Sequence, residues 1–360
     1  MESHLRPTAK FTAIWQSGNL GKDFPFYNWL MRLFEPYVSE HIFDGNHQVV
    51  MDNAILIDAW IYSMDPEYYA KFRGKNAFLV HTGDESYDLG VDRYVHFRGV
   101  FRMIWSSVFN PKHVMLLPLG SYIKEPPPNV MPVSDRRYAW SFIGDAEKVS
   151  RPDMVRAFSS LEPHICFSST PVRGFMFFGG TTGKRRIPEA DFYKILGDSV
   201  FAPAPMGNAS IESCRPYDAL EVGAIPIVER RLTLDYYKRL LGNHPIPTVS
   251  SWAEGRRLAI RLTKEPERLN DLHQTCMQWW ATYKSDLIRN IGTFLEERSH
   301  AVDDLVPLQS RLPSLPFWQY AELLRHHNAP ALYRRVSRQA ARIRTQRKWR
   351  VSTRPGVPPQ

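Results

Sequence analysis

The sequence predicts an α/β protein with two Rossmann-like domains that face each other across a cleft. Short apolar segments alternate with segments of helical period in both halves of the 360-residue chain, which is the pattern of βαβ units and parallel sheets. A proline-rich segment over residues 124–134 separates the halves, because proline continues neither a helix nor a central strand. We therefore expect one domain over residues 1–130, a second with closing helices over 131–305, and helices with a basic tail over 306–360.

In the first half, five apolar runs are expected to form strands. They cover residues 11–15, 54–60, 77–81, 94–97 and 114–117. Residues 25–40, between the first two runs, carry aromatic and leucine side chains at helical spacing, which predicts an amphipathic helix. We expect this aromatic stripe to belong to the core rather than to form a sugar-stacking surface.

The second half restarts the same alternation. Its predicted strands cover residues 138–143, 164–168, 199–202 and 225–228, and its predicted helices cover 151–161 and 190–196. Residues 232–241 and 252–297 also have helical character. Two consecutive βαβ assemblies joined by a linker favour the two-domain arrangement.

The most informative segment is residues 201–228, which reads as strand, proline/glycine turn, short helix and strand. After Gly207 of the turn come Asn208, Ser210 and Ser213, all residue types that cap a helix start. Free backbone N–H groups and the partial positive charge of a helix N-terminus would then meet the full charge of Arg215. This combination suits a diphosphate.

Two carboxylates follow on the same predicted helix face. Asp218 lies three residues after Arg215, and Glu221 lies three residues after Asp218. Carboxylates at this depth in the helix suit the hydroxyl groups of a sugar. The alternative is that the three side chains form a ladder on a solvated helix, but the preceding proline/glycine turn favours a binding site.

Three parts of this segment carry a family resemblance. They are Phe201-x-x-x-Pro205-x-Gly207, Ser213-x-Arg215-x-x-Asp218-Ala219-Leu220 and Gly223-Ala224-Ile225-Pro226-Ile227. Together they resemble the nucleotide-sugar motif of exostosin-like glycosyltransferases, and the ribitol xylosyltransferase branch looks closest.

The resemblance implies a GT-B fold and inverting transfer from a nucleotide sugar without a bound metal. It also implies an N-terminal acceptor domain, a C-terminal nucleotide-sugar-binding domain, and terminal helices that cross back onto the first domain. Arg215 would hold the diphosphate and the carboxylate at position 218 the ribose. The family usually has Glu where this chain has Asp218, so either Asp218 or Glu221 is a candidate for the ribose.

Inverting transfer also needs a base that removes the proton of the acceptor hydroxyl. Asp84 and Glu85 follow the predicted strand over residues 77–81, where side chains face the ligand-binding edge of a parallel sheet. Either of them is a candidate base, and the alternative is a pair of acids that caps a turn. Asp145, after Gly144, is a further carboxylate at such an edge and is expected to be structural.

A glycine-rich basic loop over residues 179–186 resembles a Walker phosphate loop but fails its pattern, because position 178 is Phe rather than Gly and position 185 is Arg rather than Ser or Thr. Lys184 and Arg185 are candidates for a second contact to a diphosphate, and the alternative is a plain surface loop. No Asp-x-Asp triplet occurs in the chain, so a manganese-dependent reaction lacks its usual ligands. We expect no metal and no cofactor other than the donor.

The charge of the chain is concentrated at its end. The net charge is +9, and residues 331–360 contain nine basic side chains and no acid, so the rest balances at 46 − 9 = 37 basic against 37 acidic side chains. Apolar residues at helical spacing make this tail either a basic amphipathic helix on an anionic membrane or a disordered end. Binding of nucleic acid by the tail is the less favoured interpretation.

The sequence also bears on localisation. No apolar run approaches the roughly 20 residues of a membrane span, and the N-terminus has no signal-like apolar region. Three widely spaced cysteines without a CxxC pair favour a reducing compartment. We expect a cytoplasmic protein, either free or peripheral to a membrane.

The sequence thus predicts an inverting, metal-independent glycosyltransferase with a nucleotide sugar as donor and a glycan as acceptor. The alternatives are a non-catalytic protein that binds a nucleotide or a sugar, and a nucleic-acid binder that uses the tail. The donor sugar, its base and the acceptor depend on pocket shapes formed by distant loops.

Overall fold

The structure is a computed structural model, and it contains two parallel β-sheets. It describes residues 11–16, 22, 26–58, 65–84, 90–127, 129–146, 149–168, 187–207, 210–231, 234–301 and 304–307. Residues 11–117 include the strands of the first sheet, and residues 138–249 include those of the second. The two parallel sheets with their helices confirm the predicted α/β fold with two Rossmann-like domains.

The N-terminal sheet has six strands in the order β2-β1-β3-β4-β5-β6, and all neighbours are parallel. The strands are β1 (Phe11–Gln16), β2 (Val38–Phe43), β3 (Ala54–Asp58), β4 (Ala77–His81), β5 (Gly99–Met103) and β6 (Val114–Leu117). The helical segments are α1 (Tyr27–Phe34), η2 (Glu35–Tyr37), α2 (Pro66–Ala70) and η3 (Val91–His96). Strands β1, β3, β4 and β5 are buried along their whole length, as expected for a parallel sheet covered on both faces.

The C-terminal sheet has five strands in the order β11-β10-β9-β7-β8. They are β7 (Tyr138–Gly144), β8 (His164–Ser168), β9 (Ser199–Ala204), β10 (Ile225–Glu229) and β11 (Thr248–Val249). The helical segments are η4 (Val133–Asp135), α3 (Arg151–Phe158), α4 (Glu189–Gly197), α5 (Arg215–Glu221), α6 (Tyr236–Leu241) and α7 (Trp252–Thr263). Helix α5 packs against β9 and β10, so the predicted strand–turn–helix–strand order of residues 201–228 is confirmed.

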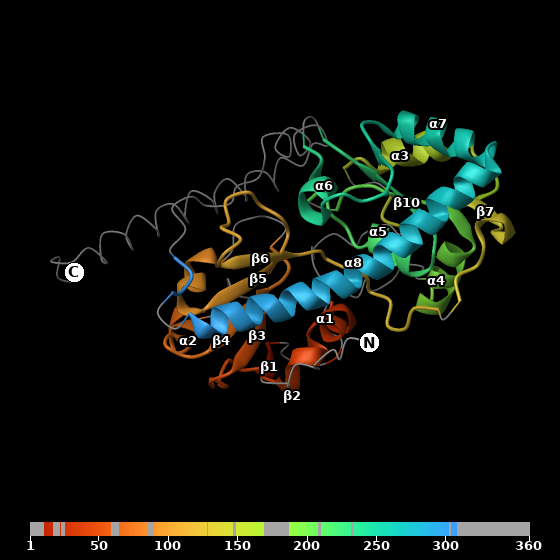
Figure 1. Cartoon of the computed structure of the whole chain (residues 1–360). Coiled ribbons are helices and arrows are strands. Elements are labelled where there is room, and N and C mark those ends of the chain that lie inside the picture. Colours follow the sequence, from red (N-terminus) through yellow and green to blue (C-terminus); the bar gives the residue numbers. More distant parts are fainter. Residues whose placement is uncertain are drawn as a thin grey trace, which may run out of the picture.

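Helix α8 (Pro266–His300) runs along both domains (Figure 1). At its middle, Trp280 stacks on Trp29 of α1 and on Tyr217 of α5, so one hydrophobic core joins the domains. Further along, Tyr37 donates a hydrogen bond to the Ile288 carbonyl at 2.7 Å. These contacts confirm that a terminal helix crosses back onto the first domain.

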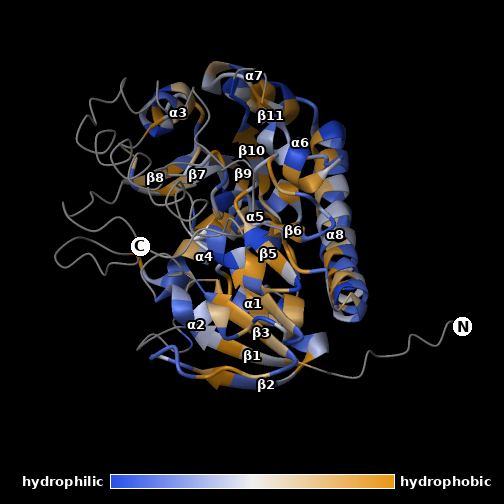
Figure 2. Ribbon diagram, turned by 90° about the vertical axis from the view of Figure 1, so that its left-hand side faces the viewer, coloured by the Kyte–Doolittle hydropathy of each residue, from blue (hydrophilic) through white to orange (hydrophobic). Residues whose placement is uncertain are grey.

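The hydropathy of the elements matches these layers. In Figure 2 the strands β1 and β3 are mostly hydrophobic, whereas α8 carries many hydrophilic segments. Apolar strands are buried under helices that keep a polar outer side. Among the helices that the structure describes, none has both the length and the apolar composition that crossing a membrane requires.

Two predictions about the first domain are wrong. Residues 94–96 belong to η3, Phe97 follows it as the C-cap, and the strand is β5 (Gly99–Met103). The buried side chains of Val91 and Tyr94 recur at the three-residue period of a 3₁₀-helix. The predicted helix over residues 25–40 ends at Phe34. Pro36 lies within η2 just after it, and the β-branched residues that follow form the edge strand β2.

Candidate functional site

The strand order of the C-terminal sheet defines where a ligand is expected. In open parallel sheets, ligands bind outside the carboxyl ends of the strands, at the point where the strand order reverses. Here β7 lies between β8 and β9, so the reversal lies between β7 and β9. Gly144 ends β7, and the segment that leads from β9 to α5 begins at Pro205. The motif of residues 201–228 therefore borders this switch point.

Arg215 is held at the switch point by the end of β7. Its Nη2 donates a hydrogen bond to the Ile143 carbonyl at 2.9 Å, and its guanidinium lies 4.4 Å from the centre of the Phe142 ring. Gly144 has φ +149°, and a Cβ at this position would overlap Nη2 of Arg215. The glycine thus leaves the space that the guanidinium occupies.

A second guanidinium, which the sequence prediction missed, lies beside the first. Arg151 begins α3, is buried, and donates hydrogen bonds to the carbonyls of Asp145 at 2.9 Å and Met206 at 3.3 Å. Burial and the nearby charge of Arg151 lower the pKa of Arg215 to about 9. Two cations that disfavour each other in one place are stabilised by an anion, so this edge of the sheet is suited to a phosphate group.

Glu229, at the carboxyl end of β10, contacts the segments that surround this switch point. Glu229 accepts hydrogen bonds from Ser150 and, at 2.7 Å, from the backbone N–H of Met206. It also pairs with Arg231 at 2.8 Å. Glu229 thus joins the start of α3 to the segment that follows β9. The signal that could have found Arg151 and Glu229 is their place in the chain, since Glu229 ends β10 and Arg151 begins the helix that follows β7.

The residues of the turn have other partners than predicted. Helix α5 begins at Arg215 with Cys214 as its N-cap and no side-chain cap, so capping by Ser210 or Ser213 is wrong. Instead, Ser210 Oγ accepts the N–H of Glu212 at 3.1 Å, and Ser213 donates to the Pro205 carbonyl at 3.4 Å. The Gly207 N–H donates to the Ser210 carbonyl at 2.9 Å. These contacts close the turn, and their role toward a donor stays a prediction.

Asp218 and Glu221 are buried at the domain interface rather than on a solvated helix face. Asp218 Oδ1 accepts the hydroxyl of Ser121 at 2.7 Å and the N–H of Tyr122 at 2.9 Å. Glu221 pairs with Lys284 of α8 at 2.8 Å and with Arg32 of α1 at 3.8 Å. Both carboxylates thus connect α5 to the linker or to other helices. The predicted contact of either one with a ribose stays a prediction.

The buried state of Asp218 predicts a pH dependence of stability. Burial raises its pKa to about 7, although the hydrogen bonds from Ser121 and Tyr122 lower it. The folded protein therefore holds this proton to a higher pH than the unfolded chain does, and the stabilising contribution is lost as the pH rises from about 4 to about 7. The free energy of unfolding of wild type relative to Asp218→Asn should fall over this interval by up to about 1.4 kcal/mol per pH unit. A difference in the free energy of unfolding between the two proteins that stays the same from pH 4 to pH 7 would contradict this.

In the N-terminal domain, Asp84 is anchored by an ion pair. It is 1% exposed, and its Oδ2 accepts Nη2 of the fully buried Arg102 at 2.6 Å. Arg102 also donates to the Tyr94 hydroxyl at 2.8 Å and lies 4.9 Å from the centre of the Phe109 ring. This network fixes the segment that follows β4.

Glu85, Lys184 and Arg185 lie outside the residues that the structure describes, as do Asn208 and the tail of residues 331–360.

Within the described part of the chain, no group of three or more His, Cys, Asp and Glu side chains is arranged to hold a metal ion. Metal independence and the absence of a cofactor stay predictions.

The overlap at Gly144 provides a test of the switch point. Gly144→Ala should displace the Arg215 guanidinium and weaken nucleoside-diphosphate binding by about tenfold, or about 1.4 kcal/mol. Gly74→Ala is the matched control, because Gly74 also has positive φ, at +86°, but has open space around it. Calorimetric titration measures both affinities. In an Arg215→Ala background, Gly144→Ala should have no further effect, and an additive loss would contradict the account.

Comparisons with known proteins give a distant similarity. No family model matches the chain, and no curated protein matches it. Among the solved structures that match is one described as "Crystal Structure of alpha1,3-Fucosyltransferase", with 14% sequence identity, a TM-score of 0.46, and coverage of 82% of this chain and 92% of that one.

Proposed function

We propose that the protein is an inverting, metal-independent glycosyltransferase that moves a sugar from a nucleoside-diphosphate sugar to a hydroxyl of a glycan. The observation that carries this proposal is the pair Arg215 and Arg151 at the switch point between β7 and β9. A diphosphate brings several negative charges to this place, and guanidinium groups bind phosphate oxygens in a bidentate manner. The exostosin-like motif around Arg215 supports the same ligand.

In this proposal Arg215 stabilises the departing nucleoside diphosphate. Negative charge develops on the diphosphate as the bond to the sugar breaks, and a preorganised cation stabilises that charge. Lys184 and Arg185 are candidates for further contacts to the phosphates. Asp218 already accepts a hydrogen bond from Ser121, and Glu221 already pairs with Lys284. A carboxylate that binds the ribose would have to keep this contact at the domain interface as well.

The base that accepts the acceptor proton is proposed to be Glu85 or Asp84. A carboxylate that is paired with a buried guanidinium is a weak base, because the pairing favours its ionised form. The ion pair with Arg102 therefore supports an anchoring role for Asp84, and we favour Glu85 for the proton transfer. A non-catalytic binder of nucleotides or sugars would not depend on either side chain.

The proposal includes no metal step, which predicts that EDTA leaves turnover unchanged. The charge of the diphosphate would be met by arginine, and no Asp-x-Asp triplet is available to hold manganese. Sugar transfer should be measured with EDTA, and again after manganese is added back to the EDTA-treated enzyme. An enzyme that EDTA inactivates and manganese restores would contradict metal independence.

The first experiment is a thermal-shift screen against nucleotide sugars and free nucleotides. A ligand that binds only the native state raises the apparent stability of the protein. For one nucleoside, both the nucleotide sugar and the free diphosphate should therefore raise the melting temperature. The stabilising donor is then tested for hydrolysis and transfer.

We also propose that the protein is cytoplasmic and that residues 331–360 make a peripheral contact with an anionic membrane. Both proposals follow from the sequence alone.

A further inference from the structure

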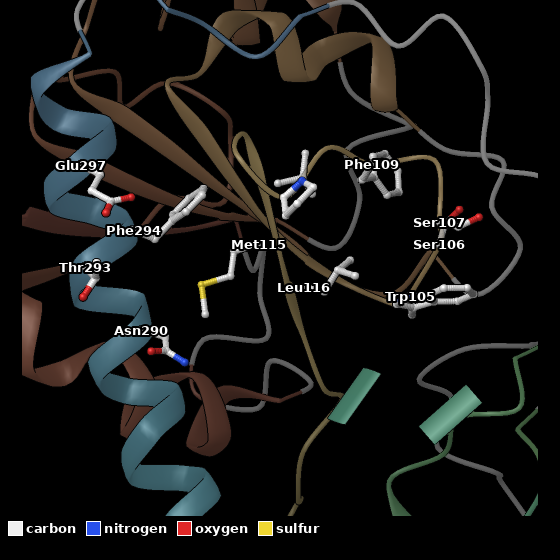
Figure 3. A pocket seen from close by; sticks show the side chains of 12 residues that line it. Trp105, Ser106, Ser107, Phe109, Met115, Leu116, Asn290, Thr293, Phe294 and Glu297 are labelled. Atoms are coloured by element: carbon white, nitrogen blue, oxygen red, sulfur yellow. The ribbon is translucent and has the colours of Figure 1, made fainter. Parts of the chain in front are cut away.

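A hollow of the N-terminal domain lies between the edge strand β6 and helix α8. It has a volume of about 520 Å³. Residues 105–107, 109, 111 and 114–116 line one side, and Asn290, Thr293, Phe294 and Glu297 of α8 line the other. Figure 3 shows these two groups of side chains facing each other across the hollow.

The lining combines aromatic faces with neutral polar groups. Trp105 and Phe109 provide the aromatic faces, and Ser107, Asn290 and Thr293 provide hydroxyl or amide groups. The single charged side chain of the lining is Glu297. Aromatic rings pack on the apolar faces of sugars, while hydroxyl and amide groups orient a ligand through hydrogen bonds. Because the lining contains no cation, it does not suit a phosphate-rich ligand.

Trp105 is held in a fixed position at one end of the hollow. It follows Ile104, a buried β-branched residue with φ +68°, and such strained conformations persist where the surrounding structure fixes them, often at functional sites. The backbone N–H of Trp105 donates a hydrogen bond to the Tyr236 hydroxyl at 2.9 Å. The two rings meet edge to face, with centroids 6.0 Å apart.

The hollow is connected to the proposed donor site. Tyr236 donates a hydrogen bond to Glu212 Oε2 at 2.7 Å, and Glu212 is fully buried three residues before Arg215. Glu212 also accepts hydrogen bonds from the N–H of Leu119 at 2.7 Å and from Tyr217 at 2.6 Å. A continuous chain of hydrogen bonds thus leads from Trp105 to the segment that carries Arg215.

The hollow is also connected to the acid pair. Phe109, which lines it, packs under the guanidinium of Arg102, and Arg102 pairs with Asp84. The hollow therefore contacts residues that are linked to both proposed parts of the reaction.

We infer that this hollow binds the neutral glycan acceptor, with one sugar ring packed on Trp105. The inference rests on the proposed function and adds to it the position and chemistry of the acceptor site. Its occupant is a neutral saccharide rather than a nucleotide or a segment of this chain.

The experiment uses the full-length protein and a panel of neutral disaccharides, lactose, cellobiose and xylobiose, measured by ligand-observed NMR. Thr293→Trp fills the hollow from the exposed side of α8, and Trp105→Ala removes the proposed ring contact. Phe43→Ala is the matched control, because Phe43 is an exposed aromatic side chain on β2, the opposite edge strand of the same sheet. Binding of nucleoside diphosphate is measured for every variant.

We expect at least one disaccharide to bind the wild type and the Phe43→Ala variant, and to lose at least tenfold in affinity in the Thr293→Trp and Trp105→Ala variants. Nucleoside-diphosphate affinity should stay unchanged in Thr293→Trp. If no disaccharide binds, or if Thr293→Trp binds it like the wild type, the inference is overturned while diphosphate binding still supports the proposed function. If the wild type itself binds no nucleoside diphosphate, the proposed function is overturned instead.

Discussion

Replacing Arg215 by alanine is expected to weaken nucleoside-diphosphate binding by about 10- to 100-fold. The guanidinium is the charged partner of the phosphate oxygens in this account, and hydrogen bonds to charged groups contribute about 1.5–3 kcal/mol each. The hydrogen bond from Arg215 to the Ile143 carbonyl is the main polar contact that the folded protein would lose, so the variant should remain folded. Titration calorimetry and the kinetics of donor hydrolysis measure the two consequences.

The matched control is Arg156→Ala. Arg156 lies on α3, the helix that begins at Arg151, but its side chain is 77% exposed and pairs with Asp153 on the same helix. Its removal lowers the charge of the domain by the same amount without touching the switch point. Equal loss of affinity in both variants would show that the effect is general electrostatics, and unchanged affinity in Arg215→Ala would remove the basis of the site.

The second large effect is expected at the acid pair, where the two neighbouring carboxylates should behave differently. Asp84→Ala leaves the buried Arg102 guanidinium without its carboxylate, and loss of one partner of a buried ion pair costs about 3–5 kcal/mol. The free energy of unfolding should fall by this amount. Glu85→Ala should leave stability unchanged and lower turnover by about 100-fold or more, as expected for loss of a general base.

A double variant separates the two roles further. Asp84→Ala combined with Arg102→Met removes both charges, and a buried pair replaced by apolar side chains is often close to neutral in stability. The double variant should therefore be more stable than Asp84→Ala alone. If Asp84→Ala unfolds like the wild type but has no turnover, then Asp84 is the base and not an anchor.

Much of the fold is visible in the sequence because parallel strands are apolar and bounded by turns. The strands β4 and β6 match their predicted bounds, and the segment around Arg215 has the predicted order of elements. The edge strand β2 is missed because its three consecutive polar residues, Ser39 to His41, give no strand-like alternation and follow a helical stripe without a break other than Pro36. Periodicity alone cannot separate the end of such a helix from the start of a strand.

The site is only partly predictable for a different reason. Arg215 belongs to a local motif, so its sequence neighbours point to it. Asp218 and Glu221 share that motif, but their partners come from Ser121, Arg32 and Lys284, which are distant in the chain. Arg151 is identified only once β7 and β9 are known to be neighbours, because this pairing brings its helix beside Arg215.

The central claim is that the carboxyl edge of the C-terminal sheet holds the diphosphate of an activated sugar. Titration of UDP, GDP, ADP and CDP into the intact wild-type protein tests it most directly. The account predicts saturable one-to-one binding of at least one of them in the presence of EDTA. Absence of heat for all four nucleotides, at concentrations that saturate ordinary donor sites, would contradict it.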